Sequence, residues 1–103
     1  MYTVIETHDF IQWAADVWSD GERSEFIGFI SANPLAGDVI PGANALRKVR
    51  WSRAGMGKRG GARVIYYNRL ANGDIVLLLV YAKAKFDQLR PELLLKIKEK
   101  YDV

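Results

Sequence analysis

The stretch that decides the fold is residues 62–82, which read ARVIYYNRLANGDIVLLLVYA. Two runs rich in β-branched and aromatic residues, 62–70 and 75–82, flank a short link that contains Asn72-Gly73. An Asn-Gly pair between two such runs is the strongest short-range signal for a β-hairpin. Because the second run is apolar at both alternating positions, it is typical of a central strand that is covered on both faces. The stretch therefore predicts two antiparallel strands inside a sheet.

Two more strands are predicted on the N-terminal side of this hairpin, over residues 46–51 and 3–6. A loop rich in glycine and turn-forming residues, 35–45, precedes the first of them. Residues 52–61, SRAGMGKRGG, contain four glycines and three cations, which predicts a mobile basic loop before the hairpin. This loop leads into a strand and lacks the G-x-x-x-x-G-K-[ST] pattern, so a nucleotide-binding P-loop is excluded.

Two helices are predicted between the first strand and the loop. The first begins at about Asp9 and has one apolar stripe. The stripe is formed by Phe10, Trp13, Ala14, Val17 and Trp18. Ser19 and Glu22 have the spacing of a capping box, which opens a second helix that ends at Asn33-Pro34. The apolar residues of this helix are Phe26, Ile27, Phe29 and Ile30. Because the link is so short, we expect an antiparallel helical hairpin.

A last helix is predicted from about Pro91, since proline is tolerated in a first helical turn. The residues expected to face inward are Leu93, Leu94, Ile97 and Tyr101, and those expected to face outward are Lys96, Lys98, Glu99 and Lys100. The element order is β-α-α-β-β-β-α. It predicts a single α+β domain over residues 1–103, with an antiparallel sheet packed by two N-terminal helices and a C-terminal helix.

Composition excludes several classes of chemistry. The sequence has no cysteine and one histidine, so it supports no disulfide, thiol nucleophile or iron–sulfur cluster and disfavours a zinc site. We expect no metal and no other cofactor, and we expect His8 to be structural or solvent-exposed. The longest apolar run is 75–82, whereas a membrane helix needs about 20 residues. We therefore expect a soluble, cytoplasmic protein without a membrane partner.

Positive charge is concentrated in one segment, although the formal net charge is only +3. Between Asp38 and Asp74 lie 35 residues that contain no carboxylate. They contain eight cations, Arg47, Lys48, Arg50, Arg53, Lys58, Arg59, Arg63 and Arg69. A solvated basic face is the simplest interpretation of an ordinary charge cluster. Because neighbouring cations repel one another, a segment of +8 favours an anionic partner instead, most simply a phosphate backbone.

Strand alternation sorts these cations between the two faces of the sheet. The helices are expected to cover the face that carries Val49, Trp51, Val64 and Tyr66. Lys48, Arg50 and Arg63 then gather on the other face, where we expect the side chains of Lys48 and Arg63 to be exposed. Trp51 is expected to lie in the core rather than to stack on a base.

A cation cluster of this kind suits a phosphodiester. Cleavage of RNA by its own 2′-hydroxyl requires removal of that proton, stabilisation of the five-coordinate phosphorus, and protonation of the departing 5′-oxygen. Arginine stabilises charge without titrating. A lysine crowded by other cations has a lowered pKa and can act as an acid or a base. Lys83 and Lys85, which follow the last predicted strand, could reach the rim of the cluster.

Four strings resemble the RelE/HigB family of bacterial toxin–antitoxin toxins, within the RelE/ParE superfamily. They are GDVIPG (37–42), LRKVRW (46–51), GKRGGARVIYY (57–67) and LVYAK (79–83). The resemblance spans essentially the whole chain, including the order of helices and strands. It implies a toxin that is a metal-independent endoribonuclease and cuts messenger RNA in the ribosomal A site, against 16S ribosomal RNA. It also implies a cognate antitoxin partner.

The resemblance further implies which residues act. Lys48 and Arg50 match a basic pair on the second strand of the RelE sheet, and Arg63 matches the arginine that opens the next strand. Lys83 falls beside the basic residues that end the last strand. These four are the candidate catalytic residues. The candidate RNA-binding residues are Arg47, Arg53, Lys58, Arg59 and Lys85.

The sequence departs from the family in its C-terminal segment. RelE has a tyrosine there that contributes to catalysis, and the corresponding residues 86–89, FDQL, contain none. The histidines used by some HigB toxins also have no counterpart. Either Tyr66, Tyr67 or Tyr81 takes this role, or the site relies on lysine and arginine alone.

Two other functions fit the same residues. A ParE-like relative with this fold would poison DNA gyrase through protein contact and cut no nucleic acid, although the basic cluster argues against it. A non-catalytic module would use the +8 segment to bind RNA or an acidic peptide. Three results distinguish these functions. The nuclease would cause loss of messenger RNA, the gyrase poison would cause DNA breakage, and the binding module would show salt-dependent binding without cleavage.

Overall fold

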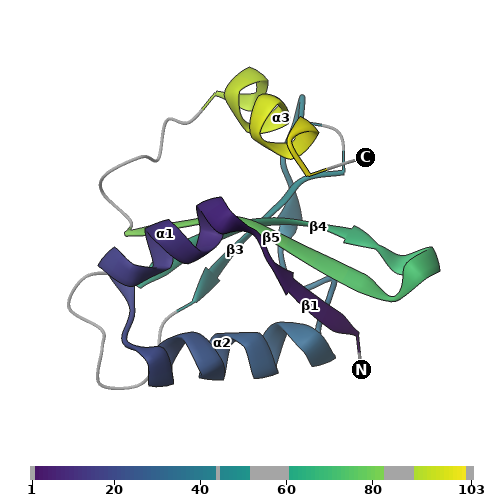
Figure 1. Ribbon diagram of the computed structural model, residues 1–103. Coiled ribbons are helices and arrows are strands. Elements are labelled where there is room, and N and C mark those ends of the chain that lie inside the picture. Colours follow the sequence, from purple (N-terminus) through teal and green to yellow (C-terminus); the bar gives the residue numbers. More distant parts are fainter. Residues whose placement is uncertain (1, 44, 52–60, 83–89, 102–103) are drawn as a thin grey trace.

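A five-stranded sheet with the strand order β1-β5-β4-β3-β2 forms the centre of the molecule (Figure 1). The computed structural model describes residues 2–43, 45–51, 61–82 and 90–101. The strands are β1 (Thr3–Glu6), β2 (Asp38–Val39), β3 (Arg47–Trp51), β4 (Ala62–Arg69) and β5 (Asp74–Ala82). The four predicted strands are confirmed to within one residue at each end, and β2 lies in the segment predicted as a loop.

The central hairpin is the one that Asn72-Gly73 predicts. β4 and β5 pair antiparallel along their whole length, and Gly73 completes the turn at φ +75°, a conformation that favours glycine. Residues 75–81 are all buried, as expected for a strand covered on both faces. The register shifts between Ile65 and Tyr66, which leaves Leu78 on β5 as the extra residue of a β-bulge.

Helices α1 (His8–Val17) and α2 (Asp20–Ala32) cover one face of the sheet. The predicted capping box opens α2: the Glu22 N–H donates to the Ser19 hydroxyl, and the Ser19 N–H donates to the Glu22 carboxylate. The rings of Trp18 and Phe26 stack 5.3 Å apart across the link, and α2 runs back in the direction opposite to α1, as the helical hairpin predicts (Figure 1). The buried residues here are Phe10, Ala14, Trp18, Phe26, Ile30, Val49, Ala62, Val64, Tyr66, Ile75, Leu77 and Val80.

Both edges of the sheet differ from the prediction, one in the direction of its strand and the other in having a strand at all. β1 pairs with β5 in parallel. Helices α1 and α2 and the strands β2, β3 and β4 lie between β1 and β5 in the chain, so no tight turn joins the two strands and forces them to be antiparallel. At the opposite edge, β2 forms a short antiparallel ladder with β3. The sheet is therefore mixed, and its β2 edge is formed by the segment that leads out of α2.

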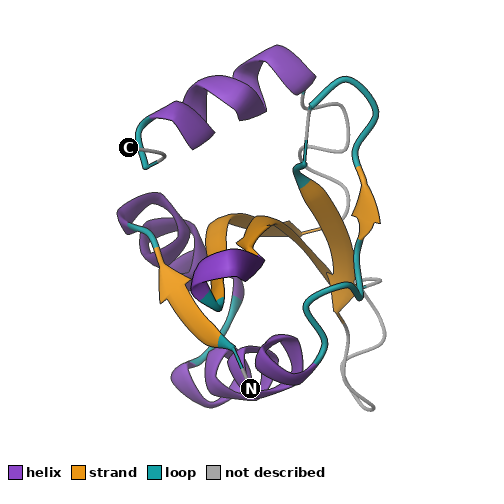
Figure 2. Ribbon diagram, turned by 90° about the vertical axis from the view of Figure 1, so that its right-hand side faces the viewer, coloured by secondary structure: helices purple, strands orange, loops and turns teal. Residues whose placement is uncertain are grey.

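Helix α3 (Pro91–Glu99) packs on part of the opposite face, so that α2 and α3 lie on opposite sides of the sheet (Figure 1 and Figure 2). Leu94 is buried there, in a second core that includes Ile65 and Tyr67. Two predicted orientations are wrong: Leu93 is 46% exposed, and the Lys98 ammonium lies 4.7 Å from the centroid of the Tyr67 ring. Because residues 93–95 are three consecutive leucines, apolar spacing does not determine the rotation of this helix; its contacts with the sheet do.

The C-terminal end of α3 is connected to the start of α1. The Lys100 ammonium lies 2.7 Å from the Asp9 carboxylate, and the backbone N–H of Asp9 donates to the Tyr101 hydroxyl at 3.2 Å. This connection holds α3 over one end of its face of the sheet. The other end of that face carries the candidate site.

Candidate functional site

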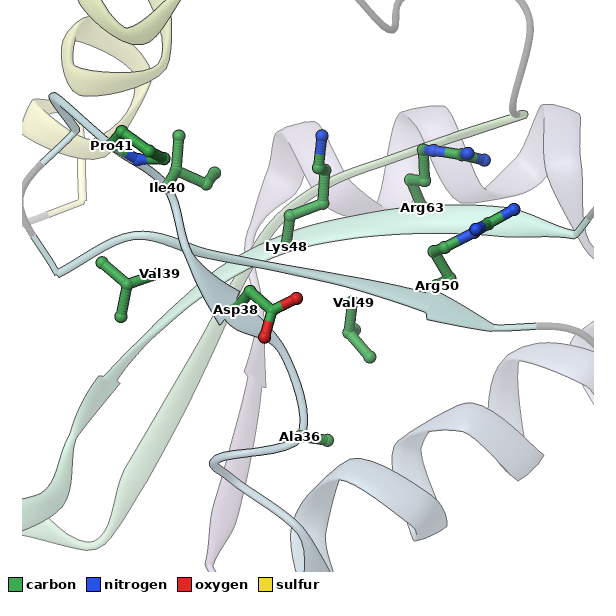
Figure 3. Close-up of a pocket in the computed structure, with 9 residues that line it drawn as sticks. All are labelled: Ala36, Asp38, Val39, Ile40, Pro41, Lys48, Val49, Arg50 and Arg63. Atoms are coloured by element: carbon green, nitrogen blue, oxygen red, sulfur yellow. The ribbon is translucent and has the colours of Figure 1, made fainter.

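A pocket of about 450 Å³ lies where β2, β3 and β4 meet (Figure 3). Its lining residues are Ala36, Asp38, Val39, Ile40, Pro41, Lys48, Val49, Arg50 and Arg63. Three of the four candidate catalytic residues, Lys48, Arg50 and Arg63, are among them. The pocket therefore gathers positive charge from two neighbouring strands beside the edge strand β2.

The strand register explains why these three cations lie together. Arg50 on β3 lies directly opposite Arg63 on β4, and Lys48 lies directly opposite Ile65, one pair further along the same face. Directly opposite residues in such a ladder have Cβ atoms about 5 Å apart, and diagonal neighbours remain within reach of long side chains. Figure 3 shows all three side chains on the same side of β3, whereas Val49 points to the other side.

The three cations differ in exposure. Arg50 is exposed, Lys48 is half-buried, and Arg63 is only 7% exposed. The expectation that the Arg63 side chain is exposed is therefore wrong, because its strand lies inside the sheet, between β3 and β5. Arg63 contributes to the floor of the pocket, whereas Arg50 and Lys48 can meet a ligand from solvent. Since like charges placed opposite one another on a sheet are destabilising, an anion would relieve their repulsion.

The pocket also contains a carboxylate, which sequence reasoning missed. Asp38 pairs with Lys48 in the β2–β3 ladder, so the two residues are direct neighbours across the strands. Hydrophobic periodicity cannot detect a strand of two residues, so the sequence of this segment predicts a loop. The only signal was the Gly37-Asp38 pair in the family-like string GDVIPG.

Four polar side-chain contacts hold the segment before β2 against the sheet. The Gly37 N–H donates to the Tyr66 hydroxyl at 2.9 Å, and the Gly37 carbonyl accepts from Arg47 Nη1 at 2.6 Å. The Pro34 carbonyl accepts from the Tyr66 hydroxyl at 2.9 Å and from the Asn68 amide at 2.8 Å. Burial raises the pKa of the Tyr66 hydroxyl above its ordinary value, which keeps it protonated as the donor of this network.

Gly37 is required for the same close approach. A Cβ at this position would lie 2.8 Å from the Lys48 carbonyl oxygen and 3.0 Å from the Tyr66 ring. These distances are shorter than a side-chain carbon tolerates. The absence of a side chain at Gly37 therefore lets β2 lie directly beside the backbone of Lys48, which places Asp38 at the pocket.

Arg47, expected to contact RNA, is not brought to this pocket. Its place in the register, opposite Tyr66, puts it on the face that α1 and α2 cover, and its guanidinium binds Gly37. It lines a second, smaller pocket with Leu35, Val39, Ala45 and Asn68. The structure thus gives Arg47 a role in holding β2, and its contact with RNA remains a prediction.

The three candidate tyrosines occupy different places. Tyr66 is fully buried in the network around Gly37. Tyr67 lies under Lys98 of α3. Tyr81 lies directly opposite Arg63 in the β4–β5 ladder and is 3% exposed. Of the three, Tyr81 is the one that pairs directly with a cation of the pocket.

Several predicted residues lie outside the described residues. They are Arg53, Lys58, Arg59, Lys83, Lys85 and the segment 86–89. Trp51 packs as predicted in the core, with its ring 4.7 Å from that of Phe29 and 5.7 Å from that of Phe26. His8 is exposed at the start of α1.

Two searches of the described residues were negative. No group of three or more His, Cys, Asp or Glu side chains lies together in a way that could hold a metal ion. Among the helices that the structure describes, none is both long and apolar enough to cross a membrane.

The chain has the fold of the RelE toxin of E. coli. One RelE structure is a double arginine-to-alanine mutant in the free state. It superposes with a TM-score of 0.61 at 12% identity, and the alignment covers 97% of this chain and 97% of RelE. A second, isolated RelE, has a TM-score of 0.59 at 14% identity and covers 94% of this chain and 99% of RelE. No protein-family model matches the sequence. At such low identity the likeness establishes the fold, and function has to be argued from the pocket.

Proposed function

We propose that the chain is the toxin of a type II toxin–antitoxin system and that it cuts messenger RNA on the ribosome. The RelE fold over nearly the whole chain supports the toxin assignment. The observation that carries the cleavage is the pocket in which Lys48, Arg50 and Arg63 converge on one face of that fold. A cation cluster that lines a pocket fits a phosphodiester better than it fits contact with a protein such as gyrase.

In this proposal the two arginines bind the non-bridging oxygens of the scissile phosphate. Arg63 lies at the floor of the pocket and Arg50 at its exposed side, so one phosphate can contact both guanidinium groups. Their permanent charge stabilises the extra negative charge of the five-coordinate phosphorus. Lys48, beside them, carries the proton that the departing 5′-oxygen requires. Lys83 remains a candidate for the same cluster.

The test uses Arg50→Gln, because Arg50 is the exposed cation of the pocket and can be neutralised without disturbing the core. Lys96→Gln is the matched control: it removes one exposed cation on α3, away from the lining residues of the pocket. After induction in bacterial cells, the wild type and the control should arrest growth and fragment messenger RNA. Arg50→Gln should cleave about 100-fold more slowly and relieve the arrest.

The same experiment separates the other functions. DNA breakage without loss of messenger RNA would replace the proposal with gyrase inhibition. Salt-sensitive RNA binding with no cleavage on assembled ribosomes would replace it with a binding module. Full toxicity of Arg50→Gln would show that the cleavage site lies elsewhere on the protein.

We also propose a cognate antitoxin as the protein partner. It would supply carboxylates over Arg50 and Lys48 or block access of the pocket to the ribosome. If charge pairing contributes, the association rate of toxin and antitoxin should fall as ionic strength rises. An association rate independent of salt would favour steric blocking.

A further inference from the structure

Among the described residues that line the pocket, Asp38 is the one with an acidic side chain. It is exposed, and its carboxylate makes no ion pair or hydrogen bond with another residue that the structure describes. Figure 3 shows this carboxylate projecting from β2 at the pocket, next to the strand that carries Lys48 and Arg50. The carboxylate is thus placed beside cations without being used to neutralise them.

The backbone on both sides of Asp38 is fixed. On one side Gly37 is bound by Tyr66 and Arg47 at 2.9 and 2.6 Å. On the other side the Ile40 N–H donates to the Leu46 carbonyl at 2.8 Å. Between these anchors Asp38 pairs with Lys48. Such a short segment, held at both ends, positions its side chain far better than a free loop would.

The chemistry of the pocket then assigns a role to this carboxylate. Removal of the 2′-proton needs a group that is unprotonated at neutral pH, whereas arginine and lysine side chains ordinarily carry their protons there. The described lining residues include no histidine, and the one histidine of the sequence, His8, lies at the start of α1. Resting on the proposed function, we infer that Asp38 is a further catalytic residue, the proton acceptor for the ribose 2′-hydroxyl of the RNA that the pocket binds.

The reaction balances with the groups in the pocket. The 2′-hydroxyl transfers its proton to the Asp38 carboxylate while the 2′-oxygen forms a bond to phosphorus. The bond from phosphorus to the 5′-oxygen then breaks, and that oxygen takes a proton from the Lys48 ammonium. The products are a 2′,3′-cyclic phosphate and a free 5′-hydroxyl, and water returns both side chains to their starting states.

Single-turnover cleavage of a messenger RNA positioned on assembled ribosomes tests this inference. Asp38→Asn keeps the size of the side chain and removes its basicity, Asp38→Glu keeps a carboxylate, and Asp16→Asn, on the exposed side of α1, is the matched control. At about pH 7, Asp38→Asn should react about 100-fold more slowly. Asp38→Glu should recover much of this loss, and Asp16→Asn should match the wild type.

The pH dependence separates proton transfer from a structural effect. Between about pH 6.5 and about pH 8.5 the wild-type rate should depend on pH less steeply than the rate of Asp38→Asn, because in the wild type a carboxylate and not hydroxide accepts the 2′-proton. In Asp38→Asn, hydroxide must replace the carboxylate, so the rate should rise about tenfold per pH unit. A slow variant with a flat profile would overturn the role of proton acceptor and leave Asp38 as a positioning residue.

The failure of this inference can be told apart from the failure of the proposed function. If the wild type cleaves and Asp38→Asn cleaves equally fast, Asp38 is not catalytic and the nuclease proposal stands. If the wild type leaves ribosome-bound messenger RNA intact, both proposals are wrong.

Discussion

On strands β3 and β4, successive residues face two different environments. On one side Val49, Val64 and Tyr66 are buried under α1 and α2, among the aromatic side chains of those helices. On the other side Arg50 lies opposite Arg63 beside an open pocket. Because the 5 residues of β3 and the 8 residues of β4 supply both sides, the difference arises from strand alternation.

The comparison shows how the fold can tolerate a repulsive cluster. The helix-covered face removes large apolar side chains from water, which stabilises the strands. At the pocket, Arg50 and Arg63 place like charges directly opposite one another, an arrangement that by itself disfavours strand pairing. The buried residues under α1 and α2 therefore contribute stability, whereas on the other face the proposed chemistry lies at the pocket, beyond the second core of Ile65 and Tyr67. Substitution of a buried residue under α1 and α2 should lower the free energy of unfolding, whereas substitution of a cation at the pocket should raise it.

The largest effect on stability is expected from Phe26→Ala. Phe26 is fully buried and its ring contacts those of Trp18 and Trp51. Its truncation leaves a cavity on the helix-covered face and should lower the free energy of unfolding by about 3 to 5 kcal/mol, measured by urea denaturation. A loss below about 1 kcal/mol would show that this face does not carry the stability of the sheet.

Gly37→Ala should have the next largest effect. The added Cβ would meet the Lys48 carbonyl at 2.8 Å, so β2 must shift away from β3. We expect a loss of about 1 to 3 kcal/mol, as for other overpacked sites, together with slower RNA cleavage.

Gly28→Ala is the matched control for this substitution. An added Cβ at Gly28 would meet nothing within 4 Å, and the residue lies in α2. Since alanine favours helix more than glycine does, this variant should gain about 0.5 to 1 kcal/mol. Equal stability of the two variants would contradict the role assigned to Gly37.

Much of this arrangement could be predicted from the sequence because it depends on local patterns. The Asn72-Gly73 turn, the capping box at Ser19 and Glu22, and the alternation along β3 and β4 each depend on neighbouring residues alone. Alternation was sufficient to place Lys48, Arg50 and Arg63 on one face.

What could not be predicted depends on contacts between distant segments. The parallel pairing of β1 with β5 joins residues about 70 positions apart, and no local pattern specifies it. The burial of Arg63 follows from the position of β4 inside the sheet. The place of Asp38 at the pocket depends on hydrogen bonds that fix the preceding residue, Gly37. These come from Tyr66 on β4 and from Arg47 at the start of β3, both distant from Gly37 in the sequence.

Tyr66→Phe tests the hydrogen bonds by which a residue of the helix-covered face holds the segment before β2, and its expected effect on stability is smaller. The substitution keeps the buried ring but removes the hydroxyl that binds Gly37 and Pro34, which should lower the free energy of unfolding by about 1 to 2 kcal/mol.

The effect of Tyr66→Phe should also depend on pH. Burial raises the pKa of Tyr66 in the folded protein above the ordinary value of 10.0. The folded state therefore retains the Tyr66 proton at a pH where the unfolded state has lost it. The stability that the protonated hydroxyl contributes is complete below pH 10.0 and is lost as the pH rises through the pKa of Tyr66 in the folded protein. Denaturation curves of the two proteins should accordingly converge at alkaline pH. A constant difference between them would contradict the link to this hydroxyl.

The smallest effect on stability, and the one of opposite sign, is expected from Arg50→Gln. This substitution removes one of two cations that face each other across β3 and β4, and Arg50 itself is exposed. The free energy of unfolding should rise by up to about 1 kcal/mol, in the same variant that loses RNA cleavage. Inorganic phosphate should raise the Tm of the wild type more than that of Arg50→Gln, because the wild-type pocket has the stronger anion site. The variant could instead be less stable than the wild type and respond equally to phosphate. Arg50 would then be a structural residue, and the assignment of the pocket cations to anion binding would be wrong.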